Sequence, residues 1–175
     1  MNDGNNFKGA TTMAKTEFVI KPGTQEIIMT RVFDAPRDLV FKTMMDVNAI
    51  PKWWGPRDHS TKVDKLEVRP GGAWRFINAD SDGNEYGFSG FYHLIDAPKR
   101  VVETYEFEGV PGHVGLVSMT LDEVDGKTRL VEHSLFPSVE DRDAVLKSGM
   151  EKGATETMDR LEELLAELTN GKHAR

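Results

Sequence analysis

One stretch near the end of the chain constrains the fold more than any other. Apolar side chains recur there at intervals of three and four residues: Met150, Ala154, Met158, Leu161, Leu165 and Leu168. These intervals place one apolar stripe on a single face of an α-helix, and charged residues fill the other faces. A helix over 150–168 would be roughly 28 Å long. Because packing rather than propensity stabilises such a helix, the rest of the chain must supply a large apolar surface for it.

Strands are the elements that the preceding hundred residues predict. Apolar and polar residues alternate there, and turn residues such as Gly and Pro separate the segments. We expect a short lead-in strand at 17–20 and longer strands at 25–33, 62–68, 73–79, 85–96, 100–108, 114–124 and 127–135. Two short helices are predicted between the second and third of these segments, the first capped by Asp34 or Ala35 and the second at 48–53. Ser138 and Asp141 predict the start of a further helix.

The order of these elements predicts an α+β protein, with the helices on one face of an antiparallel sheet. We expect a curved sheet of about six or seven strands wrapped around the C-terminal helix. The length of 175 residues suits one domain with a sizeable core. We assign that domain to residues 17–170, with a disordered extension at 1–16 and a disordered tail at 171–175.

Charge and composition narrow the function classes. The net charge of -7 argues against nucleic acid as a partner and against an anionic membrane surface. The chain has no cysteine, which removes disulfides, thiol nucleophiles and cysteine-based metal sites. No apolar run approaches the roughly 20 residues of a membrane span, and the first residues lack the apolar core of a secretory signal. We therefore expect a cytoplasmic protein without membrane insertion.

The hairpin predicted around Asp125-Gly126 places one carboxylate in an unusual position. A two-residue turn there pairs Asp122 with Arg129, which suits a cross-strand ion pair. The same register puts Glu132 opposite Met119, on a face that is otherwise mostly apolar. A buried carboxylate needs a partner or a raised pKa. Our hypothesis is that Glu132 is a polar anchor inside a cavity; the alternative is a bulge that turns it to solvent.

Aromatic residues are the other candidates for a site. Trp53-Trp54-Gly55-Pro56 follows the short helices and reads either as core packing or as the gate of a small-molecule site. The strands carry Trp74, Phe76, Phe88, Tyr92 and Tyr105, of which about half should face outward in an alternating pattern. Aromatic and methionine side chains suit a variable ligand, and they equally suit plain core filling.

Several short segments together resemble a known family. They are Arg31-Val32-Phe33-Asp34-Ala35-Pro36, Trp53-Trp54-Gly55-Pro56, Arg69-Pro70-Gly71-Gly72, Pro111-Gly112-His113, and Leu135-Phe136-Pro137-Ser138 followed by Ser148-Gly149-Met150. In this order and spacing they resemble the START-related SRPBCC superfamily. Within it, the chain is similar to the single-domain group named after the C-terminal domain of the activator of heat-shock protein 90 ATPase. Pro51 departs from the smoother run into the tryptophan pair that this group usually has.

The resemblance implies a helix-grip fold, in which an incomplete barrel holds the last helix and leaves an apolar cavity between them. It implies a hydrophobic small molecule as the partner, of lipid, sterol, polyketide or phenolic type. Two alternatives remain open. One is a co-chaperone-like protein that contacts a heat-shock ATPase, and the other is a cyclase-type enzyme that uses the same cavity.

The sequence predicts binding rather than catalysis, with no catalytic residue, no cofactor and no metal. The histidines show no ligand spacing, and no nucleophile motif occurs. We expect a monomer or weak dimer. The predicted ligand-binding residues are Trp53, Trp54, Trp74, Phe76, Phe88, Tyr92, Tyr105, Met119, Glu132, Met150, Met158 and Leu161.

Overall fold

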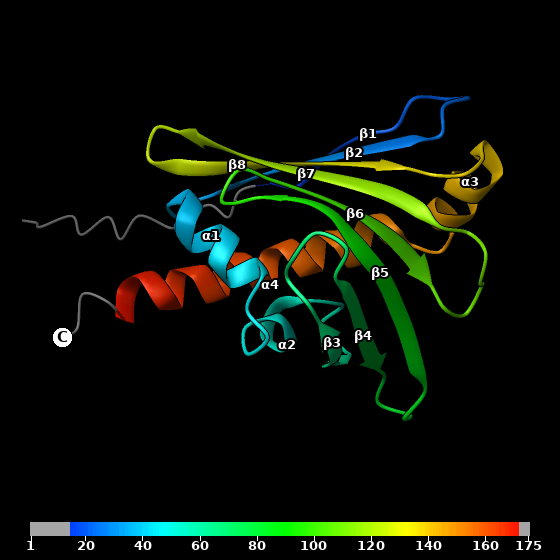
Figure 1. Cartoon of the computed structure of the whole chain (residues 1–175), viewed down its shortest axis with the longest axis horizontal. Helices are drawn as coiled ribbons and strands as arrows, with labels where there is room; N and C mark the ends of the chain where they lie inside the picture. Colours follow the sequence, from blue (N-terminus) through cyan, green and yellow to red (C-terminus); the bar gives the residue numbers. More distant parts are fainter. Residues whose placement is uncertain (1–14, 172–175) are drawn as a thin grey trace, which may run out of the picture.

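The computed structural model describes residues 15–171, and these form one antiparallel sheet with four helices (Figure 1). The strands run in the order β1-β2-β8-β7-β6-β5-β4-β3 across the sheet. Their bounds are β1 (Glu17–Val19), β2 (Glu26–Phe33), β3 (Ser60–Leu66), β4 (Ala73–Ala79), β5 (Glu85–Asp96), β6 (Arg100–Phe107), β7 (Gly115–Val124) and β8 (Lys127–Leu135). The described residues thus form eight strands. The prediction of six or seven was low because the lead-in segment also pairs with the sheet, as β1.

The helices are α1 (Arg37–Met44), α2 (Ile50–Trp53), α3 (Val139–Lys147) and α4 (Met150–Gly171). The hydroxyl of Ser138 caps α3 by accepting the Asp141 N–H, as predicted. The predicted cap of α1 was wrong: Pro36 is the N-cap residue and makes no side-chain cap bond. Pro51 lies in the first turn of α2, where its missing N–H costs no helical hydrogen bond.

The hairpin of β7 and β8 has the predicted register. Val124 pairs with Lys127, and the pairing continues without a bulge to Leu116 and Leu135. Arg129 donates a hydrogen bond to Asp122 at 2.9 Å across the two strands. Strict alternation along this hairpin therefore fixes which side chains face α4.

Helix α4 lies against one face of the curved sheet, and α1 and α2 lie beside it (Figure 1). This arrangement confirms the predicted helix-grip architecture. The apolar stripe differs slightly from the prediction, because Leu164 is buried with Met158, Leu161 and Leu165 while Leu168 is exposed. No helix among residues 15–171 is both long enough and apolar enough to cross a membrane.

A buried arginine joins β2 to α4. Arg31 faces inward and is 1% exposed. Its guanidinium donates to Asp159 and to Thr16, each at 2.8 Å, and also pairs with Glu162. Because a buried charge must be paired and hydrogen-bonded, these contacts hold α4 at one position along the sheet.

The structured region extends one residue beyond the predicted domain, 17–170, at each end. Thr16 was assigned to the disordered extension, yet it is buried and hydrogen-bonded to Arg31. Gly171, assigned to the tail, is the last residue of α4. The remaining parts of the predicted extension and tail, 1–14 and 172–175, lie outside the described residues.

Replacing Arg31 with methionine should destabilise the protein by about 2–4 kcal/mol, because the pairing of two partly buried carboxylates is lost. The matched control is Arg129→Met. Arg129 and Asp122 are both about half exposed, so that change should cost under about 1 kcal/mol. Urea unfolding at pH 7 measures both free energies. Equal costs for the two variants would contradict the account of Arg31.

Candidate ligand-binding site

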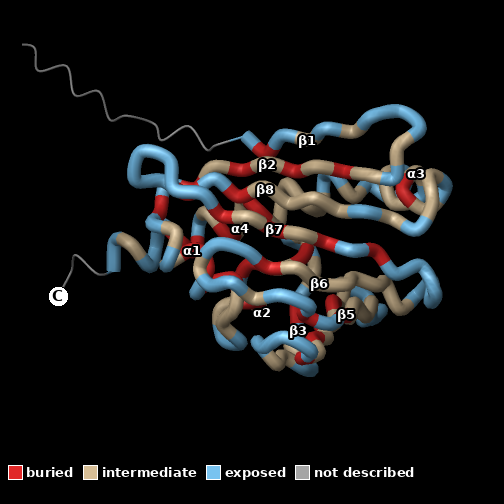
Figure 2. The backbone as a smooth tube through the Cα atoms, turned by 45° about the horizontal axis from the view of Figure 1, so that its top comes forward, coloured by how far each residue is buried: buried red, intermediate tan, exposed pale blue. Residues whose placement is uncertain are grey.

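One end of the concave face is incompletely covered by helices. None of residues 150–157, the first two turns of α4, is fully buried, whereas Met158, Leu161 and Leu165 are. The inward side chains of the strand ends nearest those turns are likewise only half-buried: Phe88, Glu103, Tyr105, Phe107, Glu132 and Ser134. Figure 2 shows buried stretches on β2, β8 and β7 near α4. We call this incompletely covered region, between the sheet and the start of α4, the hollow.

Glu132 faces this hollow. It pairs with Met119 of β7 and with Met29 of β2, both buried and both on the inward face. The alternative of a bulge is excluded by the continuous register of β8 with both neighbours. The Ser134 hydroxyl donates to one Glu132 oxygen at 3.2 Å. Glu132 is thus a carboxyl among apolar neighbours, with one weak hydrogen-bond donor.

A second carboxyl on the same face was missed by sequence reasoning. Glu103 of β6 lies between Val117 of β7 and Tyr92 of β5 in the register. The alternation of β6 could have revealed it, because Val101, Glu103 and Tyr105 are two residues apart and so share one face of the strand. We call Tyr92, Glu103, Tyr105, Glu132 and Ser134 the inner cluster.

The polar ends of the inner cluster are nearly without partners. Among the described residues, the carboxyl of Glu103 and the hydroxyls of Tyr92 and Tyr105 make no hydrogen bond, yet none of these oxygens is sealed from solvent. Tyr92 is only 4% exposed. Since buried polar groups are almost always hydrogen-bonded, atoms in this situation must open onto a space that water or a ligand occupies.

Burial raises the pKa of both carboxyl groups. Desolvation, assisted by the nearby charge of Glu132, raises the pKa of Glu103 to about 8. Desolvation also raises the pKa of Glu132, and the Ser134 hydrogen bond only partly opposes this. The pKa of the Tyr105 phenol is raised by burial and by the two carboxylates. Near neutral pH, Glu103 is therefore mostly protonated and the inner cluster carries less charge than its composition suggests.

Aromatic rings line the hollow beside the inner cluster. Phe88 is central: its ring centroid lies 5.2 Å from that of Trp54, 5.8 Å from Tyr105 and 5.1 Å from Phe107. Trp74 lies 6.0 Å from Tyr105 and 5.0 Å from Phe76. We call these six residues, Trp54, Trp74, Phe76, Phe88, Tyr105 and Phe107, the aromatic wall.

The other predicted site residues lie on the same inward side but deeper. Trp53, Met119, Met158 and Leu161 are buried in the core, and Met150 is half-buried at the start of α4. The indole N–H groups of Trp53 and Trp74 are buried without a partner. The structure therefore brings the predicted residues together on one face, with Met150 and the strand aromatics nearer the hollow than Trp53 and Leu161.

The loop after Trp53 is tied to α4. The Arg160 guanidinium donates to the carbonyls of Trp54, Gly55 and Pro56 at 2.8–3.2 Å. Gly55 has a φ of 88°, and a Cβ there would lie 2.7 Å from the Asn78 side chain. These contacts favour a fixed loop.

The loop at 109–113 is exposed, and a 2.6 Å contact between His113 and Asp141 links it to α3.

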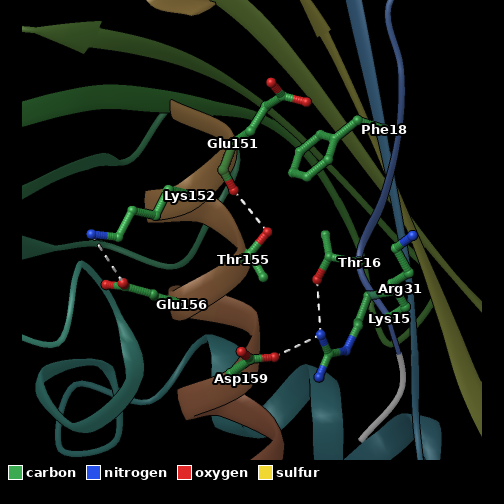
Figure 3. A pocket seen from close by; sticks show the side chains of 9 residues that line it. All are labelled: Lys15, Thr16, Phe18, Arg31, Glu151, Lys152, Thr155, Glu156 and Asp159. Carbon is green, nitrogen blue, oxygen red and sulfur yellow. Dashed lines mark hydrogen bonds and ion pairs between the residues drawn. The ribbon is translucent and has the colours of Figure 1, made fainter. Parts of the chain in front are cut away.

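An open groove of about 640 Å³ lies outside the hollow, between β1 and the start of α4 (Figure 3). Phe18 is the one large apolar side chain that lines it. Its charged residues are largely paired, Arg31 with Asp159 and Lys152 with Glu156. We place the candidate site at the inner cluster instead, because unpartnered polar groups and aromatic faces meet there.

Comparison with known proteins identifies the family. Residues 34–166 match the family described as "Activator of Hsp90 ATPase homolog 1-like protein". The chain belongs to this family. No curated protein sequence matches it.

Solved structures of similar shape support the assignment to the Hsp90-activator-like family. A Mycobacterium smegmatis protein is 25% identical with a TM-score of 0.79, over 87% of this chain and 96% of its own. A Rhodobacter sphaeroides protein is 26% identical with a TM-score of 0.78, over 86% and 99%. An AHSA1 protein from Silicibacter pomeroyi shares the fold, at 23% identity and a TM-score of 0.68, over 81% and 97%.

Within this member of the family, residues 15–171 contain no group of three or more acidic or histidine side chains placed to hold a metal ion. The inner cluster offers hydrogen-bonding groups instead. Two carboxyls and two phenols can each donate when protonated, and each can accept.

The raised pKa of Glu103 should make stability fall as pH rises. Between its ordinary value of about 4.5 and its folded value of about 8, the folded state holds the extra proton. The free energy of unfolding then decreases with pH, by at most about 1.4 kcal/mol per unit. Glu103→Gln should remove this slope. Near pH 5 the variant should match the parent, and at pH 8 it should be more stable by about 2–4 kcal/mol.

Urea unfolding at pH 5, 6, 7 and 8 measures this slope. Glu85→Gln, on the exposed start of β5, is the control for the change in net charge and should behave as the parent. A parent slope that Glu103→Gln leaves unchanged would show that Glu103 ionises freely and does not face a desolvated hollow.

Proposed function

We propose that the protein binds an apolar or aromatic small molecule in the hollow between the sheet and the first turns of α4. The ligand classes are those that the family resemblance implies: lipid, sterol, polyketide or phenolic compounds. One observation carries the proposal. The polar ends of Tyr92, Glu103 and Tyr105 make no hydrogen bond among the described residues, and they lie on the inward face beside half-buried aromatic rings.

The physical basis is desolvation against the aromatic wall. Small-molecule sites are mostly apolar, with a few polar groups that fix orientation. Phe88, Tyr105 and Phe107 are half-buried in the free protein, so a ligand ring would remove apolar surface from water at roughly 25 cal/mol per Å². The inner cluster supplies the orienting groups.

A cyclase-type enzyme is the second candidate. Two carboxyls on one face, one of them mostly protonated near neutral pH, are the pattern expected of a general acid in a desolvated site. The carboxyl of Glu103 could protonate a bound carbonyl, and Glu132 could accept a proton. Contact with a heat-shock ATPase has only the family name in its favour, so we give it less weight than the cavity.

A neutral fluorescent probe, N-phenyl-1-naphthylamine, should bind with micromolar affinity and gain fluorescence in the protein. Phe88→Leu should weaken that binding about tenfold, because it removes a ring that contacts three others and would stack on the ligand. Phe91→Leu is the matched control, since Phe91 is on the same strand but 56% exposed, and its odd spacing from Phe88 places it on the opposite face of the sheet. A fluorescence titration gives both dissociation constants.

The proposal fails if folded protein gives no saturable signal with this probe or with a panel of sterols and planar phenolics. Equal affinities for the two phenylalanine variants would place the bound probe elsewhere. Circular dichroism on both variants excludes loss of the fold as the cause of weaker binding.

A further inference from the structure

We propose that the inner cluster recognises a positively charged group, so that the ligand is a hydrophobic organic cation such as an aromatic or alkyl ammonium. This rests on the proposed function and specifies its ligand. In the bound state, the Glu103 carboxylate would pair with the cation. The faces of the aromatic wall would surround its apolar substituents.

Among the described residues, the two carboxyls lack a cation of their own. Val117 and Met119 of β7 separate Glu103 from Glu132. Tyr92 and Tyr105 are the titratable groups beside Glu103 on β5 and β6. An inward arginine, Arg31 of β2, is already paired with Asp159 and Glu162 of α4. Among the described residues, no lysine or arginine lowers the pKa of Glu103 or of Glu132.

The phenols and aromatic rings around Glu103 also favour a cation, independently of the acidic pair. Tyr92 is more than nine-tenths buried and lies directly opposite Glu103, and its hydroxyl makes no hydrogen bond among the described residues. The faces of Trp, Tyr and Phe rings attract cations within about 6 Å of their centroids. Tyr105 follows Glu103 by two residues on the same face and contacts Trp74 and Phe88. A carboxyl flanked by unpartnered phenols and stacked rings is suited to an ammonium ion with apolar substituents.

Charge decides between a cation and other ligands. An anion would meet two carboxyls with no compensating positive charge, which a desolvated site penalises strongly. A neutral ligand would meet the carboxyls only as hydrogen-bond donors and acceptors, without an ion pair. A cation would ionise Glu103, and with a pKa of about 8 this costs only about a tenfold loss of affinity at pH 7. The overall charge of -7 also favours the approach of a cation.

The test compares three probes that share one naphthalene ring. They are the cation (1-naphthylmethyl)trimethylammonium, its neutral isostere 1-neopentylnaphthalene, and the anion 1-naphthaleneacetate. The quaternary ammonium keeps its charge at every pH, so only protein groups titrate. Its affinity should rise about tenfold from pH 7 to pH 9, with release of about one proton per ligand at pH 7, while the affinity of the neutral isostere stays constant. At pH 9 the ammonium should bind at least tenfold more tightly than the isostere.

Glu103→Gln should abolish the pH dependence and weaken ammonium binding at least tenfold at pH 9, while the neutral isostere stays within about twofold. Glu85→Gln, the exposed control, makes the same change in net charge and should leave both affinities unaltered. Isothermal titration calorimetry in two buffers of different ionisation enthalpy counts the released protons.

The outcomes separate the two proposals. If the neutral isostere binds and the ammonium binds no more tightly at pH 9, the cation inference is overturned while the proposed function stands. If the ammonium binds tightly but Glu103→Gln leaves its affinity and pH dependence intact, the cation inference is likewise overturned. If none of the three probes binds, both proposals fall.

Discussion

The width of the sheet, compared with the width of one helix, determines where the site can lie. Eight strands spaced at about 4.8 Å span roughly 34 Å, whereas a helix with its side chains is about 10–12 Å across. Helix α4 therefore covers only part of the concave face, and α1 and α2 cover a further part. Arg31 holds α4 through Asp159 and Glu162. The inward side chains left at the start of α4 are half-buried, and a ligand would complete this part of the core.

The same constraint explains why carboxyls occur on an inward face. In a packed core, a carboxyl without a partner would be strongly destabilising. Beside the hollow, burial instead raises the pKa of Glu103 to about 8 and also raises the pKa of Glu132. These buried carboxyls lower the free energy of unfolding as pH rises. We interpret this loss of stability as the cost of placing a polar recognition site within an apolar surface.

Sequence reasoning recovered most of the fold because strands such as β2, β4 and β7 alternate clearly and the turns are well marked. The Asp125-Gly126 turn fixed the register that places Glu132 opposite Met119. Glu103 was missed although the alternation of β6 carried the signal, because alternation alone does not show which face of a strand points inward; pairing with β5 and β7 sets that. Reasoning also failed where position depended on packing between distant elements. Leu168 was expected in the stripe but is exposed, since local periodicity does not show where the partner surface ends.

The most direct test of the account is a nuclear magnetic resonance titration of the glutamate side-chain carboxyl carbons in the folded protein. The account predicts that the Glu103 signal shifts with a midpoint near pH 8, and that Glu132 also titrates above its ordinary range. Adding the naphthyl ammonium probe should lower the Glu103 midpoint. If Glu103 and Glu132 both titrate near pH 4.5 and the probe leaves them unchanged, neither carboxyl faces a desolvated hollow, and the proposed site is wrong.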